Sequence, residues 1–188
     1  IKEYANLLFA DSAVVDVLLA NAGYCADQLI QNERLYRDIA SQPSAPNQDQ
    51  LEAAASQHFK KVVFRDPTKD ELTKYAGLFS SSAKDGGNSE ALRVMLMAIM
   101  MHPESVYRVE IGLGEEDSHG RRMLSGTEMA FAIAFALTDR PPDAALFQAA
   151  EAGKLNNSTD AQFQVARMLQ DDAIVKPRIL RFFQEFFG

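Results

Sequence analysis

The spacing of apolar residues in this 188-residue chain leaves little room for a β-sheet. No stretch alternates apolar and polar residues over several β-branched positions, which is the pattern of a half-buried strand. Patterns that begin helices recur instead. Thr68 with Glu71, and Ser125 with Glu128, both have the spacing of a capping box. The sequence therefore predicts an all-α fold, a bundle-like or orthogonal array of about nine or ten helices.

The apolar periodicity and the breaker residues between the periodic stretches give the expected helix positions. We expect helices at about residues 2–9, 12–22, 25–40, 48–63, 69–80, 89–101, 126–138, 142–152, 159–170 and 173–187. Three linkers separate them, at Ser41–Asn47, Ser80–Asn88 and Gly112–Met123. Gly23 and Gly153 each follow an apolar helical stretch and are predicted to end a helix in the left-handed conformation.

Two of the expected helices are apolar on every face. These are Val94–Met101 and Met129–Leu137, and we expect both to be central to the core. The second is the longest apolar run and falls well short of the roughly 20 residues that cross a bilayer, so no membrane span is predicted. The closing stretch, residues 179–187, carries too many large apolar groups for a free tail. It is expected either to pack into this core or to dock on sequence that follows Gly188.

Charge and cysteine content exclude several classes of function. The 19 basic against 26 acidic residues give a net charge of −7, which repels phosphate backbones, so nucleic acid is not an expected partner. Cys25 is the single cysteine, so the chain has no internal disulfide, no zinc-binding cysteine cluster and no C-x-x-C-H attachment site for haem. We expect Cys25 to be a small packed group. The chain opens at Ile1 without a signal-peptide pattern, and we expect it to be a processed or partial gene product.

Two sets of residues resemble a known family in their order and spacing. The first set is Phe64–Glu71, Leu92-Arg93, His102-Pro103 and Tyr107–Glu110. The second set is Leu124-Ser125, Glu128, Asp139–Asp143, Gly153–Leu155, Arg167–Leu169 and Arg181–Gly188. They resemble the helical domains of unknown function found in large exported proteins of planctomycetes and some other bacteria, often beside c-type cytochrome domains. The chain departs from many relatives in having no tryptophan.

This resemblance implies two adjacent modules, at about residues 58–110 and 121–188. The expected domain plan is then residues 1–47 as unassigned helices, 48–111 as the first module and 112–188 as the second. The resemblance also implies an exported protein, in the periplasm or at the cell surface. Any haem would belong to another part of the full-length protein, and the expected partners are other domains of the same polypeptide or other protein subunits.

The histidines carry one candidate ligand. His58, His102 and His119 lack metal-ligand spacing. His102 ends the methionine-rich helix, and a histidine near a methionine can ligate haem iron, so noncovalent haem or metal binding through His102 is one hypothesis. The alternative is that the methionines belong to the core and that His102 caps the helix end.

Charged residues near His102 suggest a second hypothesis. Arg108, Glu110 and His102 could line the cleft of an enzyme that acts on a surface polymer or in redox chemistry. Arg65 is a further polar candidate. Arg–carboxylate pairs more often tie helices together, and that is the alternative for each of these residues.

Other carboxylates could in principle form a general acid and base pair. Glu104, Glu128 and Asp143 are candidates beside Glu110, although Glu128 already has a capping role. No nucleophile elbow, phosphate loop or dinucleotide-binding pattern occurs in the sequence. The leading hypothesis is therefore a non-catalytic helical scaffold or interaction module of a larger exported, cytochrome-associated bacterial protein.

Overall fold

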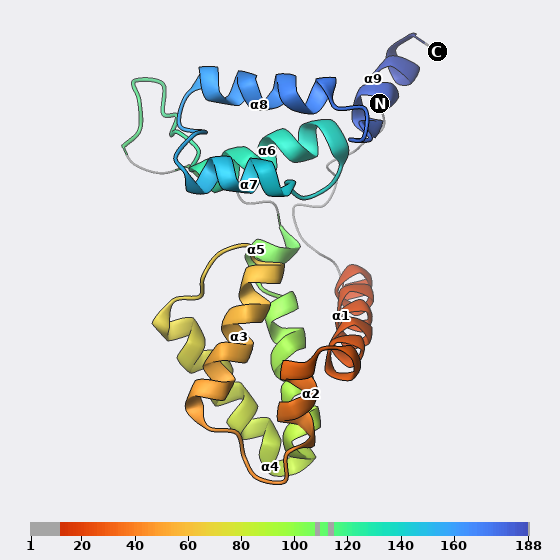
Figure 1. The fold of residues 1–188 in the computed structure, drawn as a ribbon, viewed down its shortest axis with the longest axis vertical. Coiled ribbons are helices and arrows are strands. Elements are labelled where there is room, and N and C mark those ends of the chain that lie inside the picture. Colours follow the sequence, from red (N-terminus) through yellow and green to blue (C-terminus); the bar gives the residue numbers. More distant parts are fainter. Residues whose placement is uncertain (1–11, 108–109, 113–114, 188) are drawn as a thin grey trace. The chain divides into compact units, whose positions relative to one another are not determined.

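The structure is a computed structural model that describes residues 12–107, 110–112 and 115–187, and every regular element in these ranges is an α-helix (Figure 1). The predicted all-α class is confirmed. The helix expected at residues 2–9 lies outside the described residues. The chain folds as two compact units that divide between Tyr107 and Arg108, and each has its own hydrophobic core.

The N-terminal unit is built around one long helix. Its helices are α1 (Ser12–Asn32), α2 (Arg34–Ser41), α3 (Gln48–Val62), α4 (Lys69–Met100) and α5 (Pro103–Val106). Helix α4 packs against α1, α2 and α3, so the helices before residue 48 share one core with those after it. The largest side chains buried in this core include Tyr36, Phe59, Phe79, Leu92 and Leu96.

Helix α1 runs unbroken through Gly23, so the predicted helix end there is wrong. Gly23 is buried, and a Cβ atom at this position would lie 2.7 Å from Nη2 of Arg93 in α4. The glycine thus serves a close approach between helices, not a turn. Because α1 continues, Ala22 and Ala26 face the core while Cys25 is turned outward and exposed. The expectation that Cys25 would be packed is therefore also wrong.

Helix α1 also bears on the prediction that nothing spans a membrane. By length and composition it is apolar enough to cross a bilayer, although Asp16 and Asp27 interrupt its apolar sequence. A signal sequence and the core helix of a soluble protein can have the same length and composition. In this structure α1 packs against α2 and α4.

The segment predicted to be a linker at Ser80–Asn88 is mostly helical and belongs to α4, so the prediction is wrong in extent, although a break does occur within it at Gly87. The helix bends at Gly87, whose φ of 69° is in the left-handed region. Asn88, the next residue, donates from Nδ2 to the carbonyls of Gln42 (3.0 Å) and Ser44 (2.8 Å). The bend is therefore fixed to the loop that follows α2.

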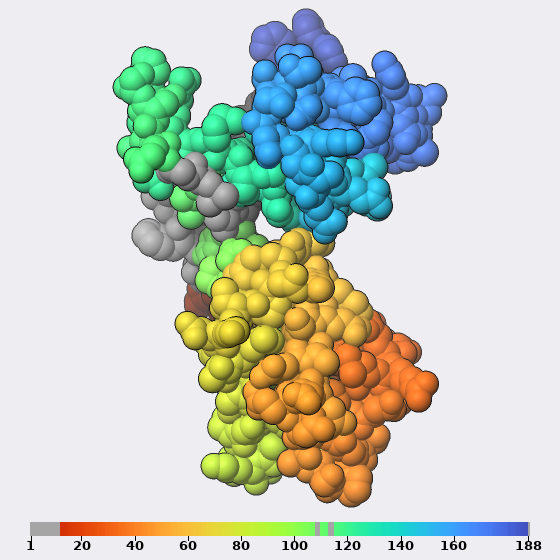
Figure 2. All heavy atoms as spheres, turned by 60° about the vertical axis from the view of Figure 1, so that its left-hand side comes forward, coloured from red at the N-terminus to blue at the C-terminus, as the bar shows by residue number. Residues whose placement is uncertain are grey.

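The described residues of the C-terminal unit form four helices. They are α6 (Gly126–Thr138), α7 (Ala144–Glu151), α8 (Ser158–Gln170) and α9 (Pro177–Phe187). Its buried core is Ala130, Ile133, Ala134, Leu146, Ala149, Leu155 and Met168. The predicted helix end at Gly153 is confirmed by its φ of 69°. The segment before α6, around residues 115–122, projects from this unit (Figure 2).

Both predicted capping boxes are present. The backbone N–H of Glu71 donates to the hydroxyl of Thr68 (3.2 Å), and the Thr68 N–H donates back to the Glu71 carboxylate (2.7 Å). Ser125 and Glu128 exchange the same two bonds at 3.1 and 2.7 Å. Each box satisfies two backbone donors that a helix start would otherwise leave unpaired.

Candidate functional site

The densest polar cluster in the N-terminal unit is centred on Arg65, in the loop between α3 and α4. Its guanidinium donates to both carboxylate oxygens of Glu71, at 2.8 and 2.9 Å, and to both of Glu104, at 2.7 and 2.9 Å. Glu71 lies in the first turn of α4 and Glu104 in α5. One arginine therefore joins the start of α4, six residues along the chain, to α5, which is 39 residues away. We call these three residues with His102 the Arg65 cluster.

The chain turns sharply to bring Arg65 into this position. Phe64, the residue before it, has a φ of 61°, which is unusual for a non-glycine residue. The Phe64 N–H donates to the Phe59 carbonyl at 3.2 Å and so closes the end of α3. A left-handed residue at this point reverses the chain direction and directs Arg65 towards the start of α4.

His102 completes the cluster. Its Nε2 lies 3.3 Å from a carboxylate oxygen of Glu71, and its Nδ1 accepts from the Glu104 N–H at 3.2 Å. The ring also meets Phe59 edge to face, at 5.5 Å between centroids. Both ring nitrogens thus have partners, and the side chain is only 14% exposed. His102 caps the start of α5 rather than the end of the preceding helix.

Electrostatics favour the charged forms within this cluster. Hydrogen bonds from Arg65, with help from the Thr68 cap, lower the pKa of Glu71 to about 2. Hydrogen bonding to Arg65 also lowers the pKa of Glu104, and the two carboxylates raise the pKa of the arginine further. Neither carboxylate is suited to act as a proton donor near neutral pH, because both are held ionised.

The other two residues of the hypothetical enzyme cleft are Arg108 and Glu110. Arg108 lies outside the described residues. Glu110 is exposed and belongs to the C-terminal unit, whereas His102 belongs to the N-terminal unit. The enzyme cleft built from these three residues therefore stays a prediction.

The methionines of the hypothetical haem site lie in and around the core. Met95 is fully buried, and Met97 and Met100 pack against the same apolar cluster. Ligation of iron through Nε2 of His102 would require that nitrogen to leave Glu71. Among the described residues, no three His, Cys, Asp or Glu side chains are grouped closely enough to hold a metal ion.

The remaining carboxylate candidates lie in the C-terminal unit, at the starts of helices. Glu128, besides its capping role, accepts from the backbone N–H groups of Ile111 (2.9 Å) and Gly112 (3.1 Å). Asp143 caps α7 and receives two hydrogen bonds from Arg167 of α8, both at 3.0 Å. Each carboxylate thus joins segments of the fold, which is the structural alternative stated for such pairs.

A buried polar pair in the N-terminal unit was not anticipated from the sequence. His58 of α3 is 1% exposed, donates from Nε2 to the Leu96 carbonyl (3.2 Å), and meets Tyr36 edge to face. Desolvation lowers the pKa of His58 to about 4, so the ring is neutral at pH 7. Burial also raises the pKa of the Tyr36 hydroxyl. Neither group is accessible for chemistry on a substrate.

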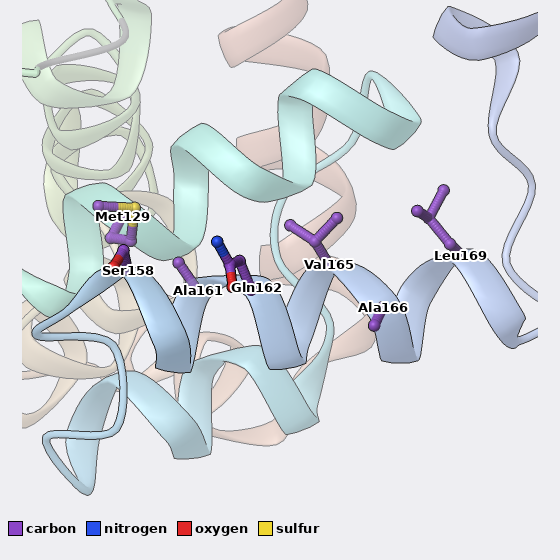
Figure 3. Close-up of a pocket in the computed structure, with 7 residues that line it drawn as sticks. All are labelled: Met129, Ser158, Ala161, Gln162, Val165, Ala166 and Leu169. Carbon is purple, nitrogen blue, oxygen red and sulfur yellow. The ribbon is translucent and has the colours of Figure 1, made fainter.

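Two apolar surface features lie on the C-terminal unit. A groove of about 470 Å³ lies between α6 and α8, lined by Met129, Ser158, Ala161, Gln162, Val165, Ala166 and Leu169 (Figure 3). Helix α9 buries none of its residues fully, and four of its phenylalanines are between 48% and 74% exposed. We call the first feature the α6–α8 groove and the second, formed by Phe182, Phe183, Phe186 and Phe187, the α9 ridge.

Comparison with known proteins gives one match, and it lies within the C-terminal unit. Residues 124–188 match a family described as PSD4, protein of unknown function (DUF1592). No curated protein and no solved structure matches the chain. The matched residues hold helices α6 to α9 with both apolar features, so the recognised domain of unknown function is the part of the chain that carries the groove and the ridge.

Proposed function

We propose that this chain is a non-catalytic helical interaction module of a larger exported protein, and that its C-terminal unit supplies the binding surface. The exposed α9 ridge carries the proposal. Monomeric soluble proteins rarely leave several adjacent large apolar side chains exposed unless the surface binds something. Aromatic side chains are also the residues most enriched where proteins bind one another.

The polar clusters also support a non-catalytic role, because their charged groups pair with one another. In the Arg65 cluster every charged group is engaged by another part of the unit, in the geometry of a clamp between segments. Asp143 and Arg167 join α7 to α8 in the same way. Each arrangement stabilises its own unit, and the pair between Asp143 and Arg167 does so in the unit that carries the α9 ridge. A rigid surface can bind without rearrangement.

Export and association with cytochrome domains form the finer part of the proposal. Their support is the family resemblance seen in the sequence. An apolar helix near the N-terminus, α1, is compatible with export. Within such a protein the module would hold neighbouring domains or subunits together, and any haem would be bound elsewhere.

A test on the full-length gene product separates this function from catalysis. Phe183→Glu with Phe187→Glu places charge in the α9 ridge, and we expect the native mass of the assembly to fall while the helical content of the chain is unchanged. His102→Ala is the matched variant at the Arg65 cluster and should leave the assembly intact. The proposal is wrong if the 188-residue chain alone turns over a polysaccharide or a redox dye and loses this activity in His102→Ala.

A further inference from the structure

We draw no further inference here: the strongest candidate, the α9 ridge on the surface of the C-terminal unit, is an exposed apolar face, and nothing in the described part of the chain shows what covers it.

Discussion

The two units use their aromatic residues in opposite ways. The N-terminal unit buries Tyr36, Phe59 and Phe79 at the centre of its core. In the C-terminal unit, the fully buried part of the described core contains only aliphatic side chains and Met168, while the α9 ridge is exposed. A core made largely of alanines brings helices close together but removes less apolar surface from water. The first unit therefore keeps its largest rings inside its core, whereas the second leaves the rings of α9 on its surface.

The largest expected effect sharpens this contrast between buried and exposed rings. Phe59→Ala should lower the free energy of unfolding by about 3–5 kcal/mol, because it leaves a cavity in the N-terminal core. The matched change in the C-terminal unit is Phe163→Ala, whose ring is 68% exposed, and it should cost less than about 0.5 kcal/mol. Urea denaturation followed by circular dichroism measures both. Similar costs for the two substitutions would remove the contrast.

The next effect depends on pH and should be confined to the N-terminal unit. The pKa of His58 is about 4 in the folded chain and near 6.5 when unfolded, so the unfolded chain takes up the proton first as the pH falls. The free energy of unfolding should therefore decline between pH 6.5 and 4, by about 3 kcal/mol in all. Denaturation at pH 6.5 and 5 avoids the titration of Glu71 and Glu104, which begins lower.

The control for this prediction removes the titrating ring. His58→Leu replaces the ring with an apolar group of similar size. The slope of the unfolding free energy against pH between 6.5 and 5 should disappear in this variant. A slope that survives the substitution would show that another group accounts for the pH dependence. Hydrogen exchange should locate the loss of protection in α3 and α4 rather than in α6 to α8.

A smaller effect is expected at the Arg65 cluster. Arg65→Lys keeps the charge but cannot make two bidentate pairs, so it should cost about 2 kcal/mol. The pKa of Glu71, about 2 in the intact cluster, should then rise towards its ordinary value of 4.5. The stabilisation by Glu71 is present above pH 4.5 and is lost as the pH falls from 4.5 towards 2. An NMR titration of the side-chain carboxylates follows this shift, and an unchanged pKa would contradict the assigned role of Arg65.

The smallest effect concerns the attachment of α9. Asp139→Asn removes the charge that pairs with Arg178 and Arg181, and these partly exposed pairs should contribute only about 0.5 kcal/mol. Asparagine tolerates the φ of 55° at this position, so the substitution isolates the charge from the backbone conformation. Amide hydrogen exchange in α9 should become faster while that in α6 does not change. Equal protection of α9 in both proteins would mean that the ion pairs do not hold it.

Local signals predicted much of the fold. Thr68 and Ser125 begin their helices as expected, because a capping box is formed by residues three positions apart and needs no distant partner. Gly23 shows where such signals fail. Its role depends on Arg93, which is 70 positions away, and a glycine chosen for close packing looks the same in the sequence as one that ends a helix.

The candidate site was less predictable for a related reason. Arg65 and His102 stood out in the sequence, but their partners Glu71 and Glu104 could not be chosen from 26 acidic residues before the fold placed α4 and α5 beside the loop. The α9 ridge was visible as a run of phenylalanines. Whether those rings would be buried or exposed depended on how much of α6 remained open to receive them, and the sequence of α9 carries no information about that.

The Arg65 cluster also determines how the chain leaves the N-terminal unit. Helix α5 has no buried residue, and the pair between Arg65 and Glu104 ties it to the loop between α3 and α4. A pulling force applied beyond Tyr107 would load this ion pair before it reached the apolar core. Ionic bonds weaken at high salt and in acid, whereas the core is less sensitive to salt. At high salt or in acid, a pulling force should therefore detach α5 while the core of the unit stays folded.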